Sequence, residues 1–325
     1  MQTDVVTGAF GYSGAVIARD LLAAGRGVRT LTGHPGRAPA GSPIEVRPMD
    51  FADPVALERD LSGAHTLYCT YWIRFPHGAA SHEVAVANLK VLFDAAARAG
   101  VQRIVHVSIT HADPASKYPY FRGKGQAEEY LATVGVPYAV VRPAILFGGN
   151  GVLLNNIAWL LRRLPVFAIG GDGAYRIRPI HVDDLARLCV SLGSGPRSET
   201  TSAPHLGPPP ESVSGPASGP QNVTVDAVGP ESVAFRDMVA AIRTAVGSRS
   251  LLVPTPGWLI PPLSSALSAM LRDKLLTSEE YYAMADGLAD SAAPATGEVA
   301  VTDWIAKHGD SLGRTYANEL TRHYR

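Results

Sequence analysis

The feature that most constrains this chain is a glycine-rich turn near its amino end. Residues 4–7 form a short apolar run typical of a buried parallel strand. Three glycines follow at three-residue spacing, and apolar residues then recur at helical spacing as far as Gly25. Such a strand–turn–helix brings the free N–H groups of a helix amino terminus close to a phosphate. The pattern predicts a dinucleotide site formed by Gly8, Phe10, Gly11, Tyr12 and Gly14; the alternative is a glycine-rich turn without a ligand.

Strand and helix patterns alternate as far as about residue 150. We expect strands at 28–32, 44–47, 65–71, 103–107 and 138–142, a helix over 84–99 and another beginning at Tyr120. This alternation is typical of a parallel sheet covered by helices on both faces. We therefore predict an α/β fold, with a Rossmann-type doubly wound parallel sheet over residues 1–150 that is completed by return elements at about 175–192 and 223–230. Residues 151–325 would mostly form a smaller carboxyl-terminal α/β substrate-binding portion.

Two segments of this second half have unusual composition. Residues 193–222 are dominated by Gly, Pro and Ser, which predicts a flexible surface insertion; the alternative is a partner-binding polyproline segment or a lid. The apolar stretch 258–271 is either core of the smaller domain or the wall of a substrate cleft. Thr277 and Glu280 have the spacing of a capping box and predict a helix start.

Composition limits the classes of ligand. The chain has 325 residues, with 29 basic and 29 acidic side chains, so there is no net positive field to attract nucleic acid. No run of 18 apolar residues occurs, and neither the two cysteines nor the ten histidines have metal-site spacing. We expect no membrane span, no metal, a small-molecule substrate, a cytoplasmic location and a monomer or homodimer.

A Tyr-x-x-x-Lys motif supplies candidate catalytic residues. Tyr120 and Lys124 lie one helical turn apart, and Ser108 follows the strand at 103–107. A tyrosine with a reference pKa of about 10 needs a neighbouring ammonium group to work as a general acid or base near neutral pH. Ser108 would polarise a substrate oxygen, with Thr110 as the alternative hydroxyl. The competing interpretation is a surface helix start with a solvated lysine.

The segment after the second strand bears on cofactor choice. An acidic residue there would bind the ribose 2′-hydroxyl of NAD and repel the 2′-phosphate of NADP. The sequence has Thr32, His34 and Arg37 instead, and the guanidinium group suits a phosphate. We therefore favour NADP(H) over NAD(H), although Arg37 could equally be a solvated loop charge.

Bulky side chains follow the fourth strand. Tyr71, Trp72 and Arg74 lie where a substrate would approach the cofactor, and Arg74 could meet an anionic group. The alternative is aromatic packing against the second domain. Thr110, His111 and Asn155 complete the expected substrate contacts.

These motifs resemble the extended and atypical-extended branch of the short-chain dehydrogenase/reductase superfamily. Further matches are Asp50-Phe51, Arg142-Pro143 and residues 179–184. Residues 70–75 and 120–124 are similar to the nucleotide-binding accessory subunit of respiratory complex I and to nucleoside-diphosphate-sugar epimerases. The resemblance implies that Asp50 and Phe51 contact the adenine, that Thr70 and Pro143 lie at the cofactor, and that Lys124 binds the nicotinamide ribose.

The sequence thus predicts an NADP(H)-dependent oxidoreductase that transfers a hydride between nicotinamide and the carbonyl or alcohol of a small, apolar metabolite, with Tyr120 as general acid/base. One alternative is an NAD(P)-dependent epimerase, isomerase or dehydratase that uses a transient hydride. Another is a non-catalytic nucleotide-binding sensor or assembly protein.

Overall fold

A computed structural model describes residues 2–194 and 222–324, and its larger lobe is built on one sheet. The strands of this sheet are β1 (Thr3–Thr7), β2 (Gly27–Thr32), β3 (Glu45–Pro48), β4 (Ala64–Cys69), β5 (Arg103–Val107), β6 (Tyr138–Pro143) and β11 (Val223–Ala227). They pair in the order β11-β6-β5-β4-β1-β2-β3, and every pair is parallel. The carboxyl ends of all seven strands therefore meet at one edge.

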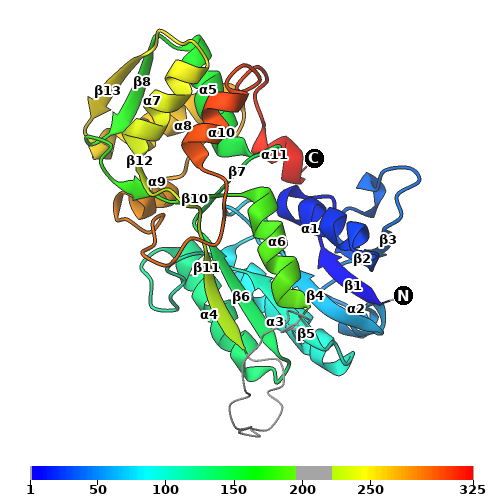
Figure 1. Cartoon of the computed structure of the whole chain (residues 1–325). Helices are drawn as coiled ribbons and strands as arrows, with labels where there is room; N and C mark the ends of the chain where they lie inside the picture. Colours follow the sequence, from blue (N-terminus) through cyan, green and yellow to red (C-terminus); the bar gives the residue numbers. More distant parts are fainter. Residues whose placement is uncertain (1, 195–221, 325) are drawn as a thin grey trace, which may run out of the picture.

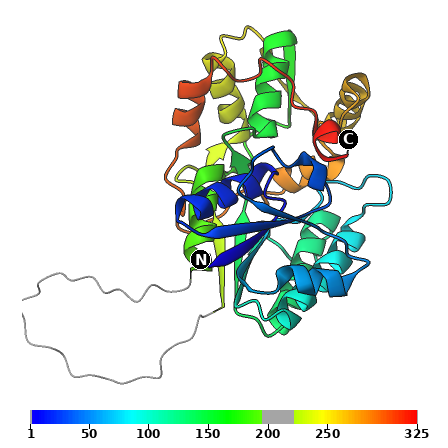
Figure 2. The same cartoon turned by 90° about the vertical axis from the view of Figure 1, so that its right-hand side faces the viewer.

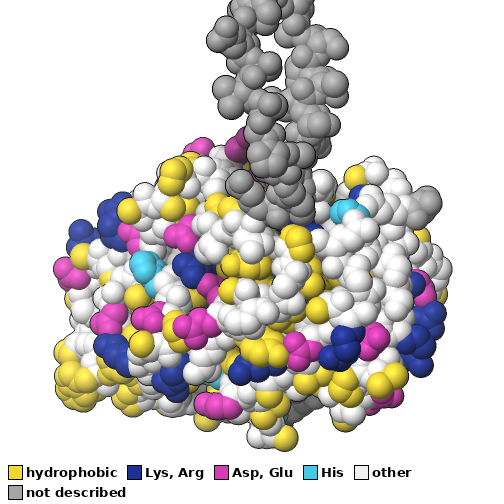
Figure 3. Space-filling model, turned by 90° about the horizontal axis from the view of Figure 1, so that it is seen from below, with side chains coloured by type: hydrophobic (Ala, Val, Ile, Leu, Met, Phe, Trp, Pro, Cys, Tyr) yellow, Lys and Arg dark blue, Asp and Glu magenta, His cyan; other side chains and the backbone are white. Residues whose placement is uncertain are grey.

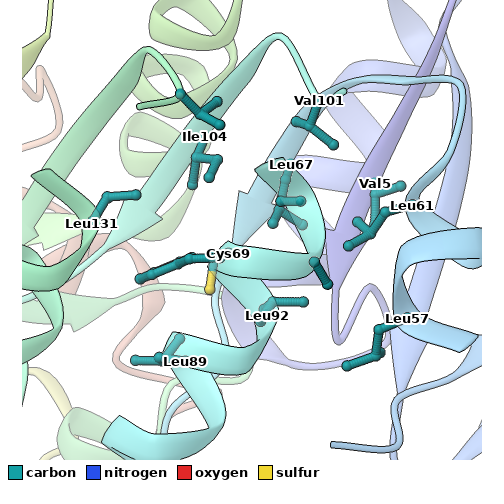
Figure 4. Close-up of a cluster of buried hydrophobic side chains, with 14 of the residues drawn as sticks. Val5, Leu57, Leu61, Leu67, Cys69, Leu89, Leu92, Val101, Ile104 and Leu131 are labelled. Carbon is teal, nitrogen blue, oxygen red and sulfur yellow. The ribbon is translucent and has the colours of Figure 1, made fainter. Parts of the chain in front are cut away.

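Helices cover both faces of the sheet (Figures 1 and 2). One layer contains α1 (Tyr12–Ala23) and α6 (Val182–Gly193), and the other contains α2 (Pro54–Leu61), α3 (His82–Arg98) and α4 (Pro119–Thr133). Because side chains alternate along a strand, Val5 packs toward α2 and α3, whereas Val6 packs toward α1 and α6. Figure 4 shows the first of these two cores, in which Val5 shares a cluster with Leu57 and Leu61.

The smaller lobe lies above the sheet in Figure 1 and has its own core. The elements of the smaller lobe are β7 (Ile145–Phe147), α5 (Val152–Arg163), β8 (Val166–Gly170), β9 (Arg176–Ile177), β10 (Pro179–His181), β12 (Val233–Ala234), α7 (Phe235–Ala245), β13 (Leu251–Thr255), η2 (Gly257–Leu259), α8 (Ile260–Leu271), α9 (Ser278–Ala285), α10 (Val301–His308) and α11 (Glu319–Tyr324). The short η1 (Pro35–Arg37) belongs to the larger lobe, where it follows β2 and contacts β3. Met238, Val239 and Ile305 are fully buried where α7 packs on α5 and α10.

The predicted Rossmann-type α/β fold is confirmed. The expected strands lie close to their predicted bounds. Strands β4, β5 and β6 are mostly buried, as inner strands of a parallel sheet are, whereas the edge strand β3 is mostly exposed. Two return elements join the larger lobe: α6 covers the sheet, and β11 extends it by pairing with β6. The predicted insertion at 193–222 falls almost wholly on 195–221, which lie outside the described residues.

Charged side chains are mixed on the surface. Figure 3 shows basic and acidic residues interspersed on the face seen from below the sheet. Within the described ranges, no helix has the length and apolar character needed to cross a bilayer.

Candidate functional site

The glycine turn has a geometry suited to an anionic ligand. Gly8 has a φ of +66°, and its carbonyl oxygen accepts a hydrogen bond from the Gly11 N–H at 2.8 Å. A Cβ atom on Gly14 would lie 2.3 Å from that oxygen, so α1 packs against the turn more closely than a side chain allows. The start of α1 has no side-chain cap and no acidic residue in its first turn. Its N–H groups and positive dipole end therefore fit a pyrophosphate.

A cavity of about 1870 Å³ begins at this turn and continues into the smaller lobe. Phe10, Tyr12 and Thr70 line its beginning, together with the glycines, and Leu263, Leu267 and Met270 of α8 line its far end. A drug-sized ligand typically occupies a pocket of roughly 300–1,000 Å³. The cavity therefore has room for a dinucleotide and a second molecule.

The end of β2 contributes three polar residues that line the cavity, Thr32, His34 and Arg37. The Thr32 hydroxyl accepts a hydrogen bond from the His34 N–H at 3.1 Å, which fixes the start of the loop. Among the described residues lining the cavity, the carboxylates are those of Glu279, Glu280 and Glu319, on α9 and α11. The β2 end of the cavity is thus without a carboxylate.

Asp50 and Phe51 have different positions. Phe51 lines the cavity and packs on the Tyr71 ring at a centroid distance of 4.9 Å. The Asp50 carboxylate accepts a hydrogen bond from the Ala52 N–H at 2.9 Å and does not line the cavity. Asp50 therefore has the geometry of a turn residue, and its contact with the adenine stays a prediction. Pro143 is likewise set back, because the cavity wall begins at the next residue, Ala144.

Tyr120 lines the cavity near its middle. Its backbone N–H donates to Glu279 Oε1 at 2.6 Å, so a carboxylate from α9 caps the first turn of α4. The Tyr120 ring meets the rings of Trp72 and His82 edge-on, at centroid distances of 5.7 and 5.6 Å. Burial raises the pKa of Tyr120 well above its usual value, and the negative charge of Glu280 adds to this effect. The phenol is therefore protonated at neutral pH.

Lys124 lies one turn further along α4 and does not line the cavity. Its Nζ donates to the Val107 carbonyl at 2.7 Å and lies 4.6 Å from the centre of the Trp72 ring. The residue is 2% exposed, and burial lowers its pKa to about 7. The structure therefore places the indole of Trp72 between this amine and the cavity.

Ser108 also lies outside the cavity. Its hydroxyl donates to Glu128 on α4, and the same carboxylate pairs with Arg142. Of the three residues expected to act together, the structure brings only Tyr120 to the cavity wall. The side chain of Ser108 is turned toward α4, and the amine of Lys124 packs against Trp72 from another segment of the chain.

Arg74 lines the cavity but is already paired. Its Nε donates to Glu280 Oε1 at 2.5 Å, and its Nη1 lies 3.4 Å from Glu319 Oε2. These bonds join the segment after β4 to α9 and α11. Two carboxylates therefore balance its charge, which corrects the expectation that Arg74 serves an anionic substrate group. Tyr71 and Trp72 line the cavity as expected.

The other expected substrate contacts connect segments of the chain. Thr110 Oγ1 donates to the Leu288 carbonyl at 3.0 Å, and a His111 ring nitrogen lies 2.8 Å from the Asp290 carbonyl oxygen. Asn155 Nδ2 donates to the Thr315 carbonyl at 2.9 Å. None of the three lines the cavity, whereas the neighbouring Asn156 does. In the described part of the chain, no three His, Cys, Asp or Glu side chains gather as metal ligands would.

Sequence reasoning undervalued α8. Ile260 and Ser264 are its buried residues, whereas Leu263 and Met270 are 50% and 69% exposed and face the cavity. The stretch 258–271 is therefore a cavity wall more than a core. The signal was present in the sequence, because a helix with no charged residue over its whole length has no face suited to water.

Comparisons with known proteins agree with this geometry. Residues 8–155 match the family model described as NAD(P)H-binding. An uncharacterised protein of Mycobacterium tuberculosis is 29% identical over 187 residues, which are 57% of this chain and 19% of that protein. The 40 kDa subunit of mitochondrial NADH-ubiquinone oxidoreductase of Neurospora crassa is 28% identical over 110 residues, 34% of this chain and 28% of that subunit. The chain thus spans about a fifth of the length of its mycobacterial relatives.

Solved structures share the fold across most of the chain. The triphenylmethane reductase of Citrobacter sp. in complex with NADP(H) has a TM-score of 0.71 at 17% identity, covering 95% of this chain and all of that chain. The NADPH-dependent quinone oxidoreductase of Escherichia coli has a TM-score of 0.70 at 18% identity, covering 93% and 98%. A nucleoside-diphosphate-sugar epimerase of Staphylococcus aureus has a TM-score of 0.68 at 16% identity, covering 94% and 100%. Residues 8–155 of the chain are therefore similar to the NAD(P)H-binding family, and the chain shares the fold of these reductases and epimerases.

Proposed function

We propose that this protein is an NADP(H)-dependent oxidoreductase that reduces an apolar, electron-poor carbonyl compound of the quinone type. The observation that carries the proposal is the continuous cavity, which connects the glycine turn to the apolar wall of α8. The bound dinucleotide would supply the hydride. The protein would orient the two molecules and exclude water from between them.

The end of the cavity at the glycine turn, called the nucleotide end below, favours NADP(H). Thr32, His34 and Arg37 line it without a neighbouring carboxylate, so a 2′-phosphate would meet hydrogen-bond donors and positive charge there. The Citrobacter and Escherichia coli neighbours are described as complexes with NADP(H) and NADPH. A fluorescence titration should therefore give a lower Kd for NADPH than for NADH.

The end of the cavity lined by α8, called the acceptor end below, favours an apolar acceptor. Leu263, Met270, Val166 and Val253 are 40% or more exposed, and all four line the cavity. A cluster of exposed apolar side chains on a concave surface is typical of a binding site for an apolar molecule. The charge of Arg74 is balanced by Glu280 and Glu319, so this arginine is not an unpaired cation for a sugar diphosphate. The epimerase alternative is therefore less well supported.

The polar groups within reach favour a quinone over a simple ketone. Tyr120 is the member of the predicted trio that lines the cavity, and its phenol is protonated. Hydride transfer to a quinone leaves a hydroquinone anion, which is far less basic than the alkoxide formed from a ketone. One proton from the Tyr120 phenol or from water completes the hydroquinone, and the nicotinamide is left oxidised.

The proposal is tested by following NADPH oxidation with a panel of apolar quinones. Tyr120→Phe should lower kcat by about 100-fold, a typical effect of losing a general acid, while the Kd for NADPH stays the same. Tyr118→Phe is the matched control, since its hydroxyl contacts Asp286 outside the cavity. Absence of NADPH oxidation with every quinone would contradict the proposed function, and unchanged turnover in Tyr120→Phe would remove the role of this tyrosine.

A further inference from the structure

Lys124 lies one turn beyond Tyr120 on α4, yet the two side chains face different surroundings. Tyr120 lines the cavity, whereas Lys124 is 2% exposed and donates its Nζ hydrogen to the Val107 carbonyl. Trp72 lines the cavity and holds its ring 4.6 Å from the Lys124 Nζ. The indole is thus the part of the protein that separates the amine from the cavity.

Packing holds the indole in this place. A Cβ atom on Gly123 would lie 2.9 Å from Trp72 Cη2, so the absence of a side chain lets the ring rest directly on α4. The His82 ring stacks on the indole with an interplanar angle of 6° and a centroid distance of 5.8 Å. Among the described residues, the buried Trp72 Nε1 has no hydrogen-bond partner. No polar bond of the indole would therefore be lost when Trp72 is replaced.

The separation has an electrostatic consequence. An ammonium group favours the phenolate of a tyrosine only when both groups share one site. Behind the indole, burial lowers the pKa of Lys124 to about 7, so a large fraction of the amine is unprotonated at neutral pH. Burial raises the pKa of Tyr120 on the other side. These two pKa shifts are those expected when neither group stabilises the charged form of the other.

We propose that Trp72 is a positioning residue that separates Lys124 from the reaction site and so restricts the enzyme to acceptors, such as quinones, whose reduction needs no ammonium-assisted tyrosine. This inference rests on the proposed function for its kinetic part. Without the indole, the ammonium group of Lys124 would stabilise the phenolate that remains when Tyr120 gives its proton to a ketone oxygen. The hydride of the reduced nicotinamide would bind to the carbonyl carbon, and water would return the proton to Tyr120.

Amine labelling tests the separation without relying on catalysis. The protein is exposed briefly to acetic anhydride at several pH values, and each lysine is quantified by peptide mass spectrometry. Lys90 and Lys117 are exposed and serve as internal references. At pH 7 we expect Lys124 in the wild type to react about tenfold more slowly than Lys90, although its lower pKa leaves more of it unprotonated. In Trp72→Ala we expect Lys124 to react at least about tenfold faster than in the wild type and to overtake Lys90.

Controls separate this effect from unfolding. Cys69 and Cys189 are both buried, so a thiol reagent reports any general opening of the fold. Trp258→Ala removes a tryptophan that is 69% exposed and does not line the cavity, and it should leave the labelling of Lys124 unchanged. Trp72→Phe is the second variant if Trp72→Ala does not fold, with an intermediate labelling rate. Equal labelling of Lys124 in the wild type and in the folded Trp72 variants would overturn the proposal.

Kinetics test the selectivity. The ratio of kcat/KM for an aryl ketone to that for a quinone should rise at least about tenfold in Trp72→Ala, and Trp72→Ala/Lys124→Met should lose this gain. An increase in labelling without a change in the ratio would overturn the role in selectivity. The expected labelling together with no activity on any acceptor would contradict the proposed function and leave the separation of Lys124 established.

Discussion

The two ends of the cavity are built in different ways. The nucleotide end comes from the turn after β1 and the loop after β2, so its geometry depends on the backbone and on a few neighbouring residues. The acceptor end combines side chains from α5, β8, α8, α9 and α11, which are far apart in the sequence. The comparison teaches that the glycine-turn end of the cavity is a local property of the chain, whereas the shape of the other end depends on the packing of the smaller lobe.

The largest effect is expected on the affinity for NADPH when one methyl group is added at the nucleotide end. In Gly14→Ala the new Cβ would clash with the Gly8 carbonyl, so the turn must move away from the pyrophosphate. We expect the Kd for NADPH to rise about 100-fold, which corresponds to about 2.7 kcal/mol, in a fluorescence titration. Gly36→Ala is the control, because a Cβ there meets no atom within 4 Å. Equal affinity in both variants would show that the turn does not set cofactor binding.

The next effect should come from the charge network of the acceptor end. Arg74→Met leaves the carboxylates of Glu280 and Glu319 without their partner, and we expect the free energy of unfolding to fall by about 2 kcal/mol. Arg98→Met is the control, because its pair with Glu58 is exposed and should contribute less than about 0.5 kcal/mol. Urea unfolding measures both variants. If they lose the same stability, the acceptor end does not depend on this network.

Removing an apolar side chain from α8 should affect the acceptor alone. We expect Leu263→Ser to raise the KM for an apolar quinone about tenfold, since burying a leucine contributes about 1.5–3 kcal/mol. The Kd for NADPH should not change. Leu251→Ser is the control, because this leucine is 63% exposed but does not line the cavity. A parallel loss of cofactor affinity would mean that the two ends are not independent.

A smaller effect is expected from Arg37 at the nucleotide end. Arg37→Ala should raise the Kd for NADPH about fivefold and leave that for NADH nearly unchanged, because the 2′-phosphate, which NADH lacks, is the part of the cofactor that the guanidinium group would contact. Arg47→Ala, which removes an exposed arginine of β3, is the control in the same titration. Equal losses for both cofactors would assign Arg37 a structural role.

The smallest expected effect is a pH dependence of the unfolding free energy, which arises where Asp273 binds the start of α11. Burial alone would raise the pKa of Asp273, but hydrogen bonds from the Tyr316 hydroxyl and from the Leu320 and Glu319 N–H groups lower it below its usual value. A lowered pKa contributes stability that is present above the unfolded value of about 4 and is lost as the pH falls through the folded value. The difference in unfolding free energy between wild type and Asp273→Asn should therefore be larger at pH 7 than at pH 3. A difference that does not vary with pH would contradict this assignment.

The same contrast explains what the sequence could predict. Gly8, Gly11 and Gly14 define their turn through local backbone conformation, so the fold and the nucleotide end followed from spacing alone. The sequence also shows that Tyr120 and Lys124 are one helical turn apart. It could not show that the indole of Trp72, 52 positions before Lys124, packs against the amine. The spacing likewise could not show that the Ser108 hydroxyl donates to Glu128 of α4, whose carboxylate also pairs with Arg142 of β6. The positions of these side chains thus depend on contacts between segments that are far apart in the sequence.

The hydrogen bond from the Tyr120 N–H to Glu279 has a mechanical consequence. Glu279 belongs to α9 in the smaller lobe, whereas Tyr120 begins a helix of the larger lobe. Any hinge movement that carries α9 away must break this bond and loosen the first turn of α4. The position of the Tyr120 ring in the cavity wall would therefore depend on how closely α9 lies against α4.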